Sequence, residues 1–180
     1  MRKALLIFSL IPSLAFSSGQ KAPPASISFH LESGEGAGAK MVREVETVVG
    51  KKWFSNSPFV SNGNVASFAP FPAKDGTSFG VVFQVDGLTA KRLEALTGTN
   101  INKLVMPVVN GQPTHVFRID ESIKDGQLVV WSGVTEREIK AYDFHFPRIG
   151  QSKEEWEKNV KKLKKELKEA EKQRKRLEKD

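Results

Sequence analysis

The side chains able to carry out chemistry are few and scattered in this chain of 180 residues. Its three histidines, His30, His115 and His145, are too dispersed to indicate a set of metal ligands, and no His-Glu-x-x-His pattern occurs. Cysteine is absent, which excludes disulfides, thiolate zinc sites and cysteine nucleophiles. No serine is identified together with a base and an orienting acid. We therefore expect no catalytic residue, no metal and no cofactor, and a binding module rather than an enzyme.

Two further groups of residues have a structural interpretation. The glycines of residues 34–39 lack the Gly-Lys-Ser/Thr ending of a phosphate-binding loop and indicate a flexible loop. Asp120, Glu121 and Asp125 flank a turn, and we interpret them as solvated turn residues rather than as a cation site. A hydrolase with two convergent carboxylates is kept as an alternative, because almost any sequence contains candidate pairs.

The N-terminus has the pattern of a signal peptide. Arg2 and Lys3 precede an uncharged, mostly apolar run over residues 4–16, which is shorter than the roughly 20 residues that span a bilayer. Small residues favour cleavage after Ala15 or after Ser17. We assign residues 1–20 to a signal peptide and expect an exported protein of the bacterial periplasm or cell envelope. An uncleaved N-terminal anchor is the alternative.

The net charge of +7 is unevenly distributed. Residues 153–180 hold 12 Lys/Arg against 8 Asp/Glu, and the spacing predicts ion pairs there between Glu154 and Lys158 and between Glu157 and Lys161. Outside this tail and the signal peptide the chain is nearly neutral. A neutral domain lacks the basic surface that binds nucleic acid, so we expect no nucleic-acid partner.

Residues 26–149 are expected to form one α+β domain. Alternating and β-branched runs separated by turn sequences predict strands over residues 27–31, 65–71, 79–85, 103–109, 114–119 and 127–132. Residues 79–85 are expected at the centre of a sheet, and residues 65–71 at an edge because proline interrupts them. Residues 41–54 indicate a strand pair, or a strand and a turn. Asn110-Gly111 between two apolar runs is the favoured turn of a hairpin.

Two short helices are expected inside this domain. One begins at a Thr89 cap and ends at Gly98, where a left-handed cap is predicted. The other opens at the capping box from Thr135 to Glu138, in which each end of the box satisfies a backbone amide of the first turn.

A charged helix is expected over residues 151–180, beginning at the capping box from Ser152 to Glu155. Apolar residues recur along it at intervals of four and three, as in the seam of a short coiled coil. We identify four of them as interaction residues: Trp156, Val160, Leu163 and Leu167. Two alternatives stay open, a single or docked helix and a helix that self-associates weakly or pairs with a partner.

The order of motifs in residues 79–142 resembles the periplasmic head subdomain of SecD, a component of the bacterial protein-export machinery. The matching positions are Thr89, Ala90, Thr97, Asn100, Lys103, Asn110, Gly111, Gly126, Gly133 and Thr135. The resemblance implies a ferredoxin-like antiparallel sheet with two helices on one face, to which the charged C-terminal helix is added. It also implies contact with translocating polypeptide. The chain lacks the family's transmembrane helices and membrane aspartate, so we expect a free-standing head domain that is not itself a proton-driven translocase.

These signals together predict an exported interaction module that contacts polypeptide in connection with protein export. The expected partner is a protein or peptide. The alternative is a structural envelope protein, whose basic tail helix makes peripheral contact with a membrane or a cell-wall surface.

Overall fold

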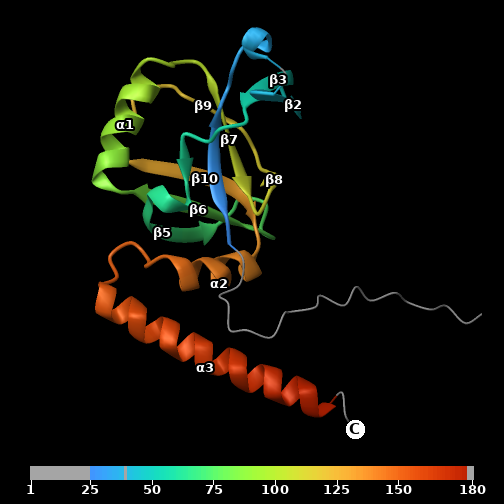
Figure 1. Cartoon of the computed structure of the whole chain (residues 1–180), viewed down its shortest axis with the longest axis vertical. Helices are drawn as coiled ribbons and strands as arrows, with labels where there is room; N and C mark the ends of the chain where they lie inside the picture. Colours follow the sequence, from blue (N-terminus) through green and yellow to red (C-terminus); the bar gives the residue numbers. More distant parts are fainter. Residues whose placement is uncertain (1–24, 39, 178–180) are drawn as a thin grey trace, which may run out of the picture.

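Figure 1 shows the computed structural model of the chain, in which residues 25–38 and 40–177 are described. The expected signal peptide, residues 1–20, lies outside the described residues. The predicted fold class is confirmed, because the chain forms an α+β fold with antiparallel strands and a long charged C-terminal helix. The strands are β1 (Ile27–Leu31), β2 (Val42–Thr47), β3 (Gly50–Ser55), β4 (Val60–Ser61), β5 (Val65–Pro72), β6 (Phe79–Val85), β7 (Leu104–Val109), β8 (Gln112–Pro113), β9 (Phe117–Arg118) and β10 (Gln127–Val134). The helices are α1 (Gly87–Gly98), α2 (Glu136–His145) and α3 (Lys153–Leu177), with short 3-10 turns at Glu35–Ala37 and Asn62–Asn64.

The strands form three antiparallel sheets, whereas the resemblance implies a single antiparallel sheet. The first has the order β4-β1-β7-β8, with β9 also paired to β7. The second has the order β10-β6-β5, which confirms the central position of residues 79–85 and the edge position of residues 65–71. The third is the hairpin β2-β3, so residues 41–54 form the strand pair. The predicted hairpin at Asn110-Gly111 is also present, although its second arm is limited to the short strands β8 and β9.

One aromatic cluster joins the first two sheets to α2. Phe83 of β6 lies edge-on to Phe29 of β1, with ring centroids 6.1 Å apart, and edge-on to Tyr142 of α2 at 5.3 Å. Phe68 of β5 contacts the same tyrosine at 5.8 Å. All four rings are fully buried. Because each comes from a different element, this cluster fixes the position of α2 relative to the two sheets.

Strand β7 is buried on both faces, which explains its uninterrupted apolar sequence. Its alternate residues Val105 and Val109 belong to the main core. The residues on its other face belong to a second, smaller cluster with Phe54 of β3: Leu104, Met106 and Val108. The β2-β3 hairpin therefore covers the far side of β7 and is held there by this second cluster.

The start of α1 differs from the prediction. The cap is Asp86, whose carboxylate accepts from the backbone amides of Leu88 at 3.0 Å and Thr89 at 2.9 Å. Thr89 instead lies inside the first turn and donates its hydroxyl to Asp86 at 2.8 Å. The predicted left-handed cap at Gly98 is also wrong, since Gly98 is helical and is followed by Thr99 in a right-handed conformation. The capping box of α2 is confirmed, because the amide of Thr135 donates to Glu138 at 2.8 Å and the amide of Glu138 donates back at 3.3 Å.

The second predicted capping box, at the start of α3, is confirmed by reciprocal bonds between Ser152 and Glu155 at 3.0 and 3.2 Å. The two predicted ion pairs of α3 do not form between described residues; the pair found on this helix joins Lys162 to Glu166 at 3.9 Å. No helix among the described residues is long and apolar enough to cross a membrane.

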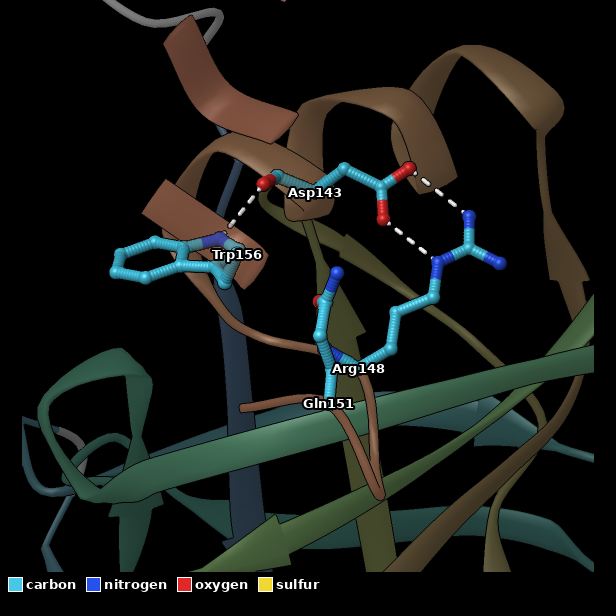
Figure 2. Close-up of polar contacts among 4 residues, drawn as sticks. All are labelled: Asp143, Arg148, Gln151 and Trp156. Atoms are coloured by element: carbon cyan, nitrogen blue, oxygen red, sulfur yellow. Dashed lines mark hydrogen bonds and ion pairs between the residues drawn. The ribbon is translucent and has the colours of Figure 1, made fainter. Parts of the chain in front are cut away.

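The first turns of α3 are fastened to the domain by four residues, which we call the tail latch: Asp143, Arg148, Gln151 and Trp156 (Figure 2). The indole of Trp156 donates to the backbone oxygen of Asp143 at 2.9 Å. Arg148 donates two bonds to the carboxylate of Asp143, at 2.8 and 2.9 Å, and its guanidinium lies 5.7 Å from the centroid of the Phe68 ring. Gln151 accepts from the amide of Arg148 at 3.1 Å.

Docking is limited to the root of the helix. Trp156, Val160 and Leu163 are half-buried, whereas Leu167 is 45 % and Leu177 79 % exposed. Figure 1 shows α3 running beyond the domain from this root. Of the alternatives left open by the sequence, docking therefore describes the first turns, and self-association or pairing with a partner stays a prediction for the rest.

Removing residues 152–180 should leave a cooperative unfolding transition, because the aromatic cluster and all three sheets lie outside the tail. We expect a modest loss of stability, about 1 to 2 kcal/mol, from the partly buried Trp156 and its hydrogen bond. Urea denaturation followed by circular dichroism measures this loss. Trp156→Phe is the matched variant, since it removes the hydrogen bond and keeps most of the apolar contact. A non-cooperative transition in the truncated protein would show that α3 belongs to the core.

Candidate functional site

An open groove of about 700 Å³ lies between the β2-β3 hairpin, the β7-β8 turn and the start of α2. We call it the hairpin groove. These elements follow one another along the same side of the molecule in Figure 1. Three segments that are distant in sequence line it: residues 45–48, residues 109–116, and residues 133–138, contributing Val45, Glu46, Thr47, Val48, Val109, Gln112, Pro113, Thr114, His115, Val116, Gly133, Thr135 and Glu138.

The lining of the hairpin groove is mainly apolar, and one of its valines is almost fully solvent-exposed. Val45 and Val116 pack against the second core cluster, so they form a fixed floor. Val48 at the tip of the hairpin is 92 % exposed. Its neighbour Val49 is 54 % exposed but does not line the groove. The Val48 side chain has few contacts within the described structure, so its apolar surface is available to a ligand.

Strand β2, which forms one wall, is an edge strand. Among the described residues it forms a ladder with β3 alone, over Val42–Thr47 and Gly50–Ser55. Its other edge has no strand partner in this part of the chain. Such an edge presents backbone donors and acceptors to an extended peptide, which adds to it as a further strand.

Two carboxylates, Glu46 and Glu138, give the groove a negative rim. Glu138 is held in place, since one of its oxygens accepts from the amide and hydroxyl of Thr135 at 2.8 and 2.9 Å, and the other accepts from the side-chain amide of Asn110 at 2.9 Å. Asn110 in turn accepts from the amide of Ser26 at 2.8 Å. The hairpin turn, β1 and the start of α2 are thereby tied together at the end of the groove.

The groove also has a histidine with a serine partner. His115 Nδ1 lies 3.2 Å from the hydroxyl of Ser132, on the exposed rim. Nucleophilic catalysis requires a third group that orients the base. Among the described residues the hydrogen bonds include no carboxylate partner for the His115 ring. The pair therefore provides a polar contact for a ligand, and it is not arranged as a triad.

Residues 76–80 read Gly-Thr-Ser-Phe-Gly, which matches the pattern of a serine-nucleophile elbow and was missed among the sequence motifs above. The motif needs a sharp turn from a strand into a helix, but here Gly76 lies in an exposed turn that leads into β6. Ser78 donates to the carboxylate of Asp75 and accepts from the amide of Gly133 at 2.9 Å. Hydrogen bonds from Ser78 and Thr77 lower the pKa of Asp75 to about 2, so this carboxylate stays ionised and holds the turn.

Most of the positions on which the sequence resemblance to SecD heads rests have a structural role here. Thr97 is fully buried; its hydroxyl donates to the backbone oxygen of Leu93 at 2.7 Å and accepts from the amide of Ile123 at 2.9 Å. Ala90 packs against Gly126, which leaves no room for a side chain there. Other positions complete turns or caps around α1: Thr89, Asn100 and Lys103.

The remaining motif positions lie at the hairpin groove. Gly133 and Thr135 line it, Asn110 holds Glu138, and Gly111 completes the hairpin turn with a φ of 81°. The four predicted interaction residues of α3 are not part of the groove.

The other histidines do not form a ligand set; no group of three or more potential metal ligands gathers among the described residues. His30 is buried in β1, where its Nδ1 donates to the backbone oxygen of Ser55 at 2.8 Å and its Nε2 accepts from the hydroxyl of Ser28 at 2.9 Å. Burial lowers the pKa of His30, which keeps the ring neutral.

No protein-family model matches the chain, and no curated protein matches it. Among solved structures, similar α+β folds occur in SecDF. A structure of this membrane component, described as enhancing protein export, has 16 % sequence identity and a TM-score of 0.47, and the match covers 67 % of this chain and 61 % of that one.

A second SecDF structure, a crystal structure in the super-membrane-facing form, has 19 % identity and a TM-score of 0.45. The match covers 64 % of this chain and 17 % of that one. This chain therefore covers less than two thirds of the length of either structure.

Proposed function

We propose that the chain is an exported interaction module of the bacterial cell envelope that binds an extended segment of another polypeptide in the hairpin groove. The observation that carries this proposal is the juxtaposition of an unpaired β2 edge with an apolar floor and the exposed Val48. An extended peptide would add its backbone to β2 and place alternate side chains on the floor.

The compartment and the class of ligand are supported by the sequence. The signal-peptide pattern of residues 1–20 supports export, and the ordered motifs of residues 79–142 that resemble the SecD head support a connection with polypeptides in transit. A domain that resembles the SecD head is consistent with a binding role. Binding rather than catalysis is favoured because the described groove holds no oriented nucleophile and base.

The charge of the groove favours a ligand with basic residues. Glu46 and Glu138 lie on its rim, and the described lining contains no lysine or arginine. A peptide that alternates valine with lysine would place its apolar side chains on the floor and its ammonium groups toward the two carboxylates. Complementary charge raises the association rate and selects against acidic segments.

Replacing Val48 by serine should weaken peptide binding without affecting the fold, because this side chain is 92 % exposed and contributes little to the core. We expect a loss of affinity of about five- to tenfold for a fluorescent ten-residue peptide of alternating valine and lysine, measured by anisotropy. Val49→Ser is the matched control, since Val49 is in the same turn but outside the groove lining, and it should leave the affinity unchanged.

The same titration tests the charge preference. An otherwise identical peptide of alternating valine and glutamate should bind at least tenfold more weakly at low salt. If neither peptide binds, or if Val48→Ser and Val49→Ser bind alike, the hairpin groove is not a polypeptide site.

A further inference from the structure

Six of the nine lysines of α3 are arranged in a single line along the helix. Starting at position 158 they recur at intervals of three and four, which places them on one face. The line consists of six residues, which we call the lysine stripe: Lys158, Lys161, Lys165, Lys168, Lys172 and Lys175. Three glutamates lie between the first and the last of them but at other positions of the helix: Glu166, Glu169 and Glu171. At 1.5 Å per residue the stripe is about 26 Å long.

The lysine stripe faces away from the domain. At 100° per residue its centre lies about 150° around the helix from the apolar seam that begins at Trp156. The seam side is the one that docks, because Trp156, Asn159 and Leu163 lie with Arg148 and Asp143 around the small hollow between α3 and the domain. All six stripe lysines are exposed. Docking of the root therefore directs the stripe toward solvent and fixes its orientation.

The charges of the lysine stripe are not neutralised within the described protein. None of its six members forms an ion pair with a described residue, although glutamates lie four residues before Lys158 and Lys161. The described domain outside α3 is nearly neutral, so the stripe is a separate positive surface and not part of a larger basic patch. A straight row of unpaired ammonium groups is complementary to closely spaced phosphates.

We propose that the lysine stripe binds the surface of an anionic phospholipid bilayer, with α3 lying flat on the headgroups and its apolar seam turned toward the domain. A bilayer is favoured over a folded polyanion because a flat surface can contact all six lysines of a straight helix at once. A polyanion chain that wraps around the protein would need further basic residues on the domain, and the domain is nearly neutral. Apolar insertion is not part of this contact, since no apolar side chain occupies the stripe positions. Binding is electrostatic and weakens with salt.

The test is sedimentation with vesicles, using the chain from residue 21 onward, which keeps every described residue. The probe is vesicles of phosphatidylglycerol and phosphatidylcholine in equal parts, compared with phosphatidylcholine alone. Replacing Lys161, Lys165 and Lys168 by glutamine should lower the partition coefficient about a hundredfold at low salt. The matched control replaces three lysines on other faces of the same helix, Lys153, Lys162 and Lys164, and should lower it far less.

Two further variants separate the causes. Arginine in place of the same three stripe lysines keeps the charge and should retain binding to the vesicles. Val48→Ser should bind vesicles as the parent does, so failure of the hairpin groove to bind peptide can be told apart from failure of the lysine stripe to bind vesicles. Equal losses in the stripe and control variants would overturn the proposal, as would loss of binding in the arginine variant. Absence of binding to anionic vesicles would also overturn it. Stripe-dependent binding to soluble polyphosphate but not to vesicles would assign the stripe to a soluble polyanion instead.

Discussion

Phe83→Ala should destabilise the protein by about 3 to 5 kcal/mol, the largest effect expected of any substitution considered for this fold. The ring of Phe83 is fully buried and contacts both Phe29 at 6.1 Å and Tyr142 at 5.3 Å. Its removal leaves a cavity where both main sheets and α2 meet, and rings on three elements cannot all move inward to fill it. Urea denaturation followed by circular dichroism gives the free energy of unfolding.

Trp131→Ala provides the matched control for this experiment. Trp131 is an aromatic residue on the neighbouring strand β10, but it is 59 % exposed and its ring contact is with Phe71 at 6.2 Å. Its loss should cost about 1 kcal/mol. A cost for Phe83→Ala similar to that of Trp131→Ala would mean that the two sheets do not share a close-packed core.

Gly126→Ala should cost about 2 to 5 kcal/mol, for two separate reasons. Gly126 has a φ of 69°, a left-handed conformation that costs a residue with a Cβ roughly 1 to 2 kcal/mol. In addition, a Cβ at this position would lie 2.9 Å from the Cβ of Ala90, which is fixed on α1, and this overpacking adds about 1 to 3 kcal/mol. The close approach of α1 therefore explains why glycine stands at this position.

Gly76→Ala separates these two contributions. Gly76 has the same φ of 69°, but a Cβ there would meet nothing within 4 Å. Gly76→Ala should therefore show the backbone strain alone, and the difference between the two variants measures the clash with α1. Equal losses in chemical denaturation would show that the contact between Gly126 and Ala90 is not close.

Features encoded by a few adjacent residues could be predicted from the sequence. The Asn110-Gly111 turn and the capping boxes at Thr135 and Ser152 are examples, because each depends on short-range geometry and on hydrogen bonds within four residues. The cap of α1 was assigned to Thr89 instead of Asp86, although both residues suit a cap. The carboxylate of Asp86 accepts two amide bonds and also the Thr89 hydroxyl, and this combination decides where the helix begins.

The hairpin groove could not be predicted in this way. Its walls come from residues 45–48, 109–116 and 133–138, and they meet only because β7 is buried between two clusters, one of which holds the β2-β3 hairpin. For residues 41–54 the sequence predicts a strand pair or a strand and a turn, but it does not show that Val48 and Val49 form the exposed tip of the hairpin. The lysine stripe was readable from the sequence as a spacing, but the direction in which it faces depends on the bond between Trp156 and Asp143.

The tail latch holds only the N-terminal end of the long helix α3. Helix α3 has 25 residues and is therefore about 37 Å long, yet the hydrogen bond that joins it to the domain, from Trp156 to Asp143, lies at its root. By simple leverage, a rotation of about 10° at the latch would swing the far end of the helix by about 6 Å. The two bonds from Arg148 to Asp143 therefore help to hold the angle between α3 and the domain. We expect Arg148→Lys to change this angle, and with it the direction of the lysine stripe, while the sheets stay folded.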